Sequence, residues 1–345
     1  MAVRQRVLLI LVLLATASVV PAELSRRPRP WLGHASKRHA PLPRAPAVDV
    51  PAYFTAWRQA YLRANETSDV SGLVRGIFLG EDSAVAPPVR ELFRDAGLSH
   101  LLAASGYNCW IVALAFGLAL QLAARACAGQ LPARISLQAR RTAAPLSRLA
   151  GAWLFWLWTD QSPPITRSAL MITAKSALDA AGIAVPLWRL LLGQYLVSLT
   201  VAPALWHSAS FQLTYGCLFG ILSVPRLFAR FRPETGLLSG APWDYFFTSL
   251  GAVTGCLPAC WIAFGEVNFT SITTNWFAVP PVSFAIMPLA LAQMLLLAPG
   301  LGVEHTRLGL LATHALGGAA SEAATLLHRA LAAWMSVAPS LRWHP

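Results

Sequence analysis

The chain alternates long apolar runs with short polar segments, and this pattern predicts a series of membrane helices. The clearest apolar runs cover residues 101–124, 190–206, 208–224, 245–264 and 276–298. Each run is close to the length of about 20 residues that a helix needs to cross the hydrocarbon core. The run at 101–124 contains no charged residue, so we predict that a membrane helix begins there, directly after a polar stretch.

Other segments are too short or too polar for a simple span. Residues 149–159 end before Asp160 and two prolines, which predicts a broken or re-entrant helix, followed by a return helix at 168–185. Residues 308–316 are too short to span, and residues 321–337 mix charges with leucines, as in an interfacial amphipathic helix. We also predict short amphipathic helices at the membrane surface over residues 53–63 and 87–96.

The two ends of the chain differ from its centre. Residues 1–22 combine early arginines, an apolar run and small-residue triplets, which indicates a signal peptide or a signal anchor. Residues 23–71 form a basic, proline-rich exported arm with one amphipathic helix, residues 72–300 form the membrane domain, and residues 301–345 form an interfacial tail. The predicted fold is an all-α integral membrane protein, a polytopic bundle of roughly six to eight membrane helices with broken, re-entrant and interfacial helices.

Composition supports this class, because 56% of the residues are hydrophobic and only 12% are charged, against about 25% in soluble domains. The net charge is +12. Such an excess suits an anionic lipid or another polyanion, and arginine-rich cytoplasmic loops produce the same totals. Arginines gather at residues 125–148 and again at 226–232, so we predict that both segments are cytoplasmic loops. The polar stretch before residue 101 then lies at the outer face.

Few residues indicate chemistry. Lys175 and Asp179 are four residues apart and can form an ion pair on one helix face, either as a structural pair or as part of a transport path. The cysteines lie in apolar runs without histidine or carboxylate neighbours, so we expect no metal site and no cofactor. Nucleotide-binding and hydrolase motifs are absent from the sequence, and we expect no enzyme activity. His100 and Ser105 leave an intramembrane protease open as a minor alternative.

Residues 97–108 read Gly-Leu-Ser-His-Leu-Leu-Ala-Ala-Ser-Gly-Tyr-Asn. Leu-Gly-Glu precedes them at 79–81, and three blocks follow, Thr-Arg-Ser-Ala-Leu-Met at 166–171, Ser-Phe-Gln-Leu at 210–213 and Asn-Trp-Phe-Ala-Val-Pro at 275–280. In this order the blocks resemble the central membrane domain of the ComEC competence family. The resemblance implies a channel in the bacterial inner membrane that passes single-stranded DNA into the cytoplasm during natural transformation.

The resemblance also suggests which polar residues lie along a DNA path. These candidates are His100, Ser105, Gly106, Tyr107, Asn108, Arg167, Gln212 and Asn275. Their hydroxyl, imidazole and amide groups can equally hold helices together. Arg167 can offer a phosphate a fixed guanidinium or anchor its helix at the interface. Typical members have a leucine-like residue and a histidine after the Ser-Gly pair, whereas Tyr107 and Asn108 follow here, so we expect a different pore lining.

Larger members of the family carry an oligonucleotide-binding-like domain and a metallo-β-lactamase-like domain, and we expect neither in this chain. The expected partners are therefore single-stranded DNA, membrane lipid, a separate nuclease, a DNA receptor and a cytoplasmic ATPase, and a homo-oligomer is compatible with the sequence. An alternative function is that of a degenerate family member, which acts as a membrane scaffold or as a permease for small solutes.

Overall fold

The computed structural model describes residues 51–65, 69–103, 105–126, 133–159, 161–233, 240–302, 306–338 and 341–343. The predicted signal segment and the arm up to residue 50 lie outside the described residues. The helices are α3 (Ala52–Ala64), α4 (Asp69–Leu79), α5 (Pro87–Asp95), α6 (Ser99–Leu102), α7 (Gly106–Ala126), α8 (Ala133–Trp158), α9 (Pro163–Ala180), α10 (Leu187–Val201), α11 (Ala209–Phe228), α12 (Ala241–Phe264), α13 (Ser271–Pro281), α14 (Met287–Leu296) and α15 (Arg307–Val337).

Short elements connect these helices. They are the 3₁₀ turns η1 (Asp82–Ala84), η3 (Pro203–His207) and η4 (Ala229–Phe231), the π-helical segment η5 (Val282–Ile286) between α13 and α14, and the strands β1 (Val267–Asn268) and β2 (Arg342–Trp343). The two strands pair in antiparallel orientation. The predicted all-α class is thus confirmed for the described part of the chain.

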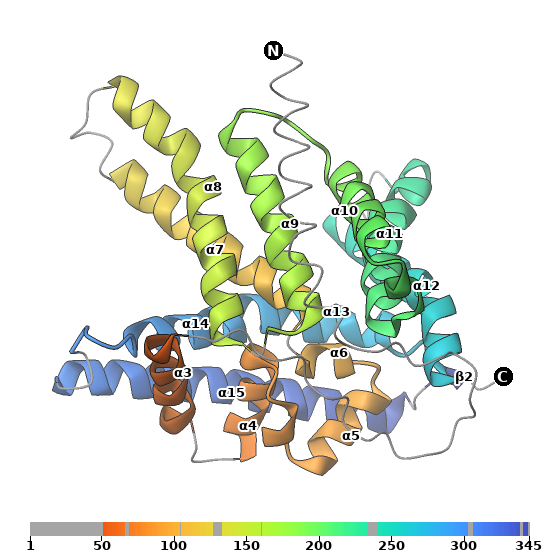
Figure 1. The fold of residues 1–345 in the computed structure, drawn as a ribbon. Coiled ribbons are helices and arrows are strands. Elements are labelled where there is room, and N and C mark those ends of the chain that lie inside the picture. Colours follow the sequence, from red (N-terminus) through yellow and green to blue (C-terminus); the bar gives the residue numbers. More distant parts are fainter. Residues whose placement is uncertain are drawn as a thin grey trace.

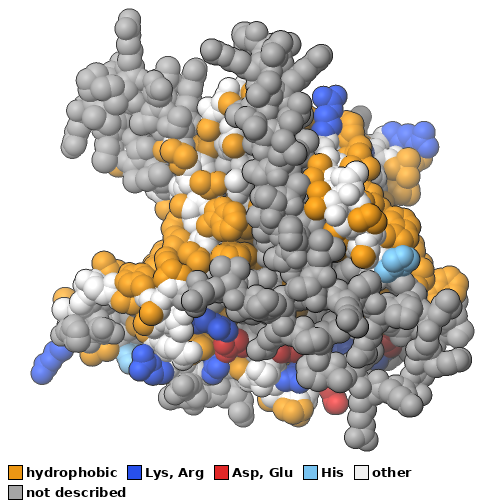
Figure 2. All heavy atoms as spheres, in the orientation of Figure 1, with side chains coloured by type: hydrophobic (Ala, Val, Ile, Leu, Met, Phe, Trp, Pro, Cys, Tyr) orange, Lys and Arg blue, Asp and Glu red, His pale blue; other side chains and the backbone are white. Residues whose placement is uncertain are grey.

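The helices form two parts (Figure 1). Helices α7 to α12 run up and down in the upper part of the view, whereas α3 to α6 and α13 to α15 form a lower layer, in which α14 and α15 lie across the lower ends of the upper helices. Figure 2 shows hydrophobic side chains over the sides of the upper helices, and the acidic side chains visible on this face lie in the lower layer. The upper helices therefore suit a membrane, and the polar helices α3 to α6 of the lower layer suit water and lipid headgroups, whereas α13 and α14 in this layer are apolar.

Three helical segments of the described chain are long and apolar enough to cross a membrane, and two shorter apolar helices accompany them. The three are Ala209–Phe231, Ala241–Phe264 and Ser271–Leu296. Together with the apolar composition, they make this a membrane protein. The third segment, which combines α13, η5 and α14, runs across the lower ends of the others (Figure 1). The count of six to eight spans remains a prediction.

Helix α8 corrects the prediction of a broken helix at residues 149–159. These residues are the second part of a continuous helix, Ala133–Trp158, which also contains arginines that we predicted to lie in a cytoplasmic loop. Arginine has a high helix propensity, so a run of arginines does not end a helix. Helix α9 begins at Pro163, where the missing N–H of proline costs nothing. The predicted break is therefore a turn between two antiparallel helices.

Two further predicted boundaries are wrong. Residues 308–316 and 321–337 belong to one continuous helix, α15. Gly317, between the two predicted segments, does not end the helix and packs against the side chain of Gln293. The apolar run that we predicted to start a helix at residue 101 is divided, because α6 ends at Leu102 and Ala103 adopts an extended conformation. Helix α7 then starts at Gly106.

Two hydrophobic cores lie inside the protein. The larger core collects buried side chains from α3 to α9 and from α13 to α15, including Phe78, Phe155 and Trp158. The smaller core lies among α9, α10 and α11 and contains Phe211 and Tyr215. Because α9 contributes to both cores, it connects α7 and α8 with α10 and α11.

Helices α11 and α12 are held together by glycines. Gly216 and Gly220 on α11 face Gly251 and Gly255 on α12, and a Cβ atom added at any of them would lie 1.9 to 2.4 Å from a backbone oxygen of the partner helix. Small residues let two backbones approach closely, and this contact drives helix association in membranes. The small-xxx-small spacing on both helices is a sequence signal for this pairing that the apolar pattern alone does not reveal.

Candidate functional site

The polar stretch at residues 97–108 folds as a helix, a break and a second helix. Gly97 follows the end of α5 and has a φ of +73°, a backbone conformation that residues other than glycine rarely adopt. A Cβ at this position would also lie 2.8 Å from the Cβ of Ser271. The short helix α6 follows and leaves His100 exposed, and then the chain breaks before α7.

The break places Ser105 and Asn108 at the start of α7. The hydroxyl of Ser105 accepts a hydrogen bond from the backbone N–H of Asn108 at 3.3 Å, as a helix cap does. The amide Nδ2 of Asn108 donates to the carbonyl of Ile77 in α4 at 2.7 Å, and this side chain is only 1% exposed. Its Oδ1 atom has no hydrogen-bond partner within the described chain. Asn108 therefore connects α7 to α4, and Ser105 serves the helix start.

Gly106 and Tyr107 direct the start of α7 toward other helices. A Cβ atom on Gly106 would lie 2.1 Å from the hydroxyl of Ser168, so α7 meets the first turns of α9 there. The hydroxyl of Tyr107 forms a hydrogen bond with Ser283 in the π-helical segment η5. Such π-helical turns occur frequently at functional sites. The start of α7 thus lies between α9 and the segment that joins α13 to α14.

Asn275 lies on α13 near this position. Its carbonyl accepts a hydrogen bond from the hydroxyl of Tyr245 at 2.7 Å. The side chain of Asn275 is 8% exposed, and its Oδ1 atom has no hydrogen-bond partner among the residues that the structure describes. Ser283, the partner of Tyr107, also donates to the carbonyl of Val279 at 2.7 Å, so the sequence blocks at 97–108 and 275–280 meet at one place.

Arg167 is buried between α9 and α11, with 6% of its surface exposed. Its Nη2 atom donates to the carbonyl and hydroxyl of Ser210, each at 3.0 Å, and to the hydroxyl of Thr214 at 2.8 Å. The guanidinium also lies 6.0 Å from the ring centre of Phe211. On α10, Gln194 donates to the carbonyl of Arg167 at 2.9 Å. This polar contact connects three helices where the smaller core meets α9.

Gln212 lies apart from this contact. Its side-chain amide donates to the carbonyl of Trp206 at 2.9 Å, at the connection between α10 and α11. The block at residues 210–213 thus contributes Ser210 to the contact with Arg167, whereas Gln212 belongs to the connection. Ser210 and Thr214 are 43 and 47 residues from Arg167, so helix spacing alone could not indicate them.

Lys175 and Asp179 form an ion pair on α9, and a second cation joins them. Asp179 also accepts from the guanidinium of Arg148 on α8 at 2.8 Å. All three side chains are between 21% and 25% exposed. Arg148 belongs to the arginine-rich stretch whose composition predicts a loop, so the sequence does not indicate this contact. Two cations share one carboxylate, so this group carries one excess positive charge.

The lower layer contains a similar group. Glu81 lies between Arg58 of α3 and Arg75 of α4, at 2.7 and 2.8 Å. Tyr61 is fully buried nearby, and burial raises the pKa of its phenol well above the usual value, because the phenolate would lose its hydration. Glu81 thus fixes the angle between α3 and α4. No group of three histidine, cysteine or carboxylate side chains in the described ranges could hold a metal ion.

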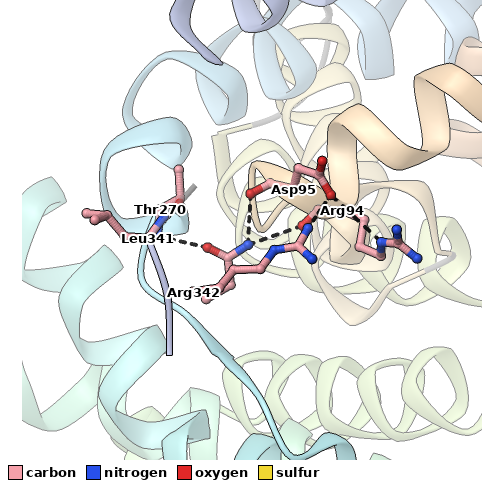
Figure 3. Close-up of polar contacts among 6 residues, drawn as sticks. Arg94, Asp95, Thr270, Leu341 and Arg342 are labelled. Carbon is pink, nitrogen blue, oxygen red and sulfur yellow. Dashed lines mark hydrogen bonds and ion pairs between the residues drawn. The ribbon is translucent and has the colours of Figure 1, made fainter. Parts of the chain in front are cut away.

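The end of α5 is tied to the C-terminal segment of the described chain (Figure 3). Arg342 forms an ion pair with Asp95, and the backbone N–H of Leu341 donates to the hydroxyl of Thr270 at 2.7 Å. The side chain of Asn268 donates to the carbonyls of Arg94 and Asp95 at 3.2 and 2.9 Å. We refer to β1, β2 and these contacts as the strand clamp, which fixes the position of α5 and of the turn that follows it.

Residues 77–340 match the competence protein family. The chain belongs to this family. The matched range contains the polar stretch at 97–108, Arg167, Asn275 and strand β1 of the strand clamp, and the family resemblance inferred from the sequence is confirmed. No solved structure matches the chain.

Individual relatives support the family match. The chain is 28% identical to ComE operon protein 3 of Bacillus subtilis over 235 residues, which are 67% of this chain and 27% of that protein. It is 39% identical to Competence protein ComA of Neisseria gonorrhoeae over 119 residues, 34% of this chain and 16% of that protein. It is 25% identical to the uncharacterized protein YcaI of Escherichia coli over 65% of this chain and 29% of that protein. The matches thus span less than a third of the length of these relatives.

Proposed function

We propose that this protein takes part in DNA uptake for competence and that it forms part of the passage for single-stranded DNA across the bacterial inner membrane. The observation that carries the proposal is the match of residues 77–340 to the competence protein family. In this proposal all of the helices α7 to α12 cross the membrane, which gives six of the predicted spans, and the lower layer faces the outside.

The contact around Arg167 suits such a passage. Arg167 meets hydroxyl groups of Ser210 and Thr214 where α9, α10 and α11 come together, whereas most of the surrounding side chains are apolar. A guanidinium with neutral hydroxyl partners can exchange them for a phosphate, because a charge-assisted hydrogen bond to an anion is stronger. The strand would pass along α9, between the larger and the smaller core.

Other polypeptides complete this function in the proposal. A DNA receptor delivers the strand, a separate nuclease removes its complement, and a cytoplasmic ATPase pulls on the emerging end. The chain itself contacts membrane lipid and single-stranded DNA, and it performs no catalysis. Positive charge helps to hold a polyanion without regard to base sequence, as transformation requires.

The test is uptake of labelled DNA in a strain from which the gene is deleted. We expect the label to bind at the surface but not to enter the cytoplasm, and a plasmid copy of the gene should restore entry. An Arg167→Ala copy should restore less entry than an Arg189→Ala copy, which loses an exposed arginine on α10, at equal protein levels on an immunoblot. Normal cytoplasmic entry of label in the deletion strain would refute the proposal and favour a scaffold or permease.

A further inference from the structure

A pocket of 350 Å³ lies in the lower layer, between the turn η1 and helices α5 and α6. Arg90, Arg94 and Glu91 of α5 line it together with Ser99 and Leu102 of α6. Its volume is at the lower end of the range for pockets that bind small molecules. The pocket therefore has room for a ligand of about the size of one nucleotide, and it directly precedes the break before α7.

The two arginines are one helical turn apart, and their surroundings leave them able to bind an anion. Arg90 uses its Nη2 atom to donate to the carbonyls of Asp82 and Val85, at 2.6 and 3.1 Å. Both bonds use the same nitrogen, Nη2, and they hold the guanidinium in place. The position of the guanidinium is thus determined before any ligand arrives.

Arg94 is held less tightly than Arg90. Its side chain is 59% exposed, and its carboxylate neighbour, Asp95, lies 3.8 Å away. Asp95 is engaged by Arg342 of the strand clamp, as Figure 3 shows. An exposed contact of this length is worth little to Arg94, because water screens it. Most of the charge of Arg94 is therefore available to a ligand, while the clamp holds its backbone in place through Asn268.

We infer that this pocket receives one nucleotide of the incoming DNA strand, with its phosphate on Arg90 and Arg94 and its sugar or base against Leu102 and Pro87. The inference rests on the proposed function and adds the place where the strand first meets the protein. Leu102 and Pro87 offer apolar surface without hydrogen-bonding groups, so they accept any base. The hydroxyl of Ser99 adds a donor for a phosphate oxygen.

The pocket also contains two carboxylates, Asp82 and Glu91, so its four charged side chains sum to zero. The two carboxylates lower the affinity of the pocket for a phosphate. A lower affinity suits passage, because a site in a conduction path must bind strongly enough to admit the strand and weakly enough to release it. The carboxylates also allow the direction of an effect to be tested, because removal of one negative charge should strengthen the binding of a polyanion.

The experiment measures the binding of a short fluorescent oligothymidylate to the full chain in lipid nanodiscs, at several salt concentrations. We expect Arg90→Gln/Arg94→Gln to lower the slope of log affinity against log salt by about 0.7, because the two arginines together hold one phosphate and each lost phosphate contact removes about 0.7 for single strands. The control is Arg63→Gln/Arg329→Gln, which removes two exposed arginines of the lower layer outside the pocket. An equal loss of slope in the control would assign the effect to net charge and overturn the inference. Unchanged binding in the pocket variant, or no binding by the unaltered protein, would also overturn it.

Glu91→Gln provides the second arm. We expect tighter binding of the oligothymidylate, by about threefold to tenfold, because the substitution removes the repulsion between this carboxylate and the phosphate. Unchanged or weaker binding of the oligothymidylate would overturn the inference. The uptake assay separates the two proposals. If the gene deletion blocks DNA entry while the pocket variant transports normally, the pocket inference fails and the proposed function stands.

Discussion

The glycine contact between α11 and α12 allows one prediction to be worked out in detail. In Gly220→Ala the new Cβ atom would lie 1.9 Å from the carbonyl oxygen of Gly251, about 1.5 Å short of the 3.4 Å at which ordinary contact begins. The obstacle is backbone, so no side chain can rotate away. The two helices must move apart, and a gap of 0.5–1 Å already forfeits a quarter to a half of each dispersion contact. We expect a net loss of about 1–3 kcal/mol of stability.

The matched control is Gly318→Ala on α15, where a Cβ atom would have nothing within 4 Å. Both substitutions raise helix propensity by up to about 1 kcal/mol, so their difference isolates the contact between α11 and α12. The assay is thermal unfolding of the detergent-purified protein, followed by the loss of its monodisperse elution peak. Gly318→Ala should unfold at or above the temperature of the unaltered protein, and Gly220→Ala several degrees below it. Equal unfolding temperatures for the two variants would refute the close contact.

Two other predictions concern ion pairs. Asp179→Asn leaves the cations of Arg148 and Lys175 without their shared carboxylate, so we expect a loss of about 1–3 kcal/mol in thermal unfolding, which the further substitution Lys175→Met should partly restore. No loss in the single variant would show that the three groups contribute nothing. Arg342→Ala releases Asp95 and should speed amide hydrogen exchange in α5 while leaving exchange in α11 unchanged; equal effects in both helices would contradict a local clamp.

The apolar pattern predicted some helices well because their boundaries coincide with changes in polarity. Helices α11 and α12 follow uninterrupted apolar runs, and each lies within a few residues of its predicted range. The amphipathic helices α3 and α5 were predicted for a related reason, since their polar and apolar residues alternate with the helical period. For such segments the local sequence and the tertiary structure agree.

Other segments could not be predicted locally. The arginines of α8 predict an exposed loop, because charged residues are usually exposed. One of them, Arg148, instead forms an ion pair with Asp179 in the neighbouring helix α9. Most of the candidate site residues have partners far along the chain, as with Asn108 and Ile77, or Arg167 and Thr214. A single sequence shows which side chains are polar, but it does not show which carbonyls and hydroxyls accept their hydrogen bonds. The glycine pairing was the exception, because its spacing was visible on both helices.

The strand clamp has a consequence for the biogenesis of the protein. Asp95 and Arg342 are 247 residues apart, so at a synthesis rate of about 5–20 residues per second roughly 10–50 s pass between their appearance on the ribosome. During that interval the helices of the upper part can enter the membrane one after another, while the end of α5 still lacks its last partners. Closure of the lower layer is therefore among the final events of synthesis, and a chain that stops early would reach the membrane with this layer still open.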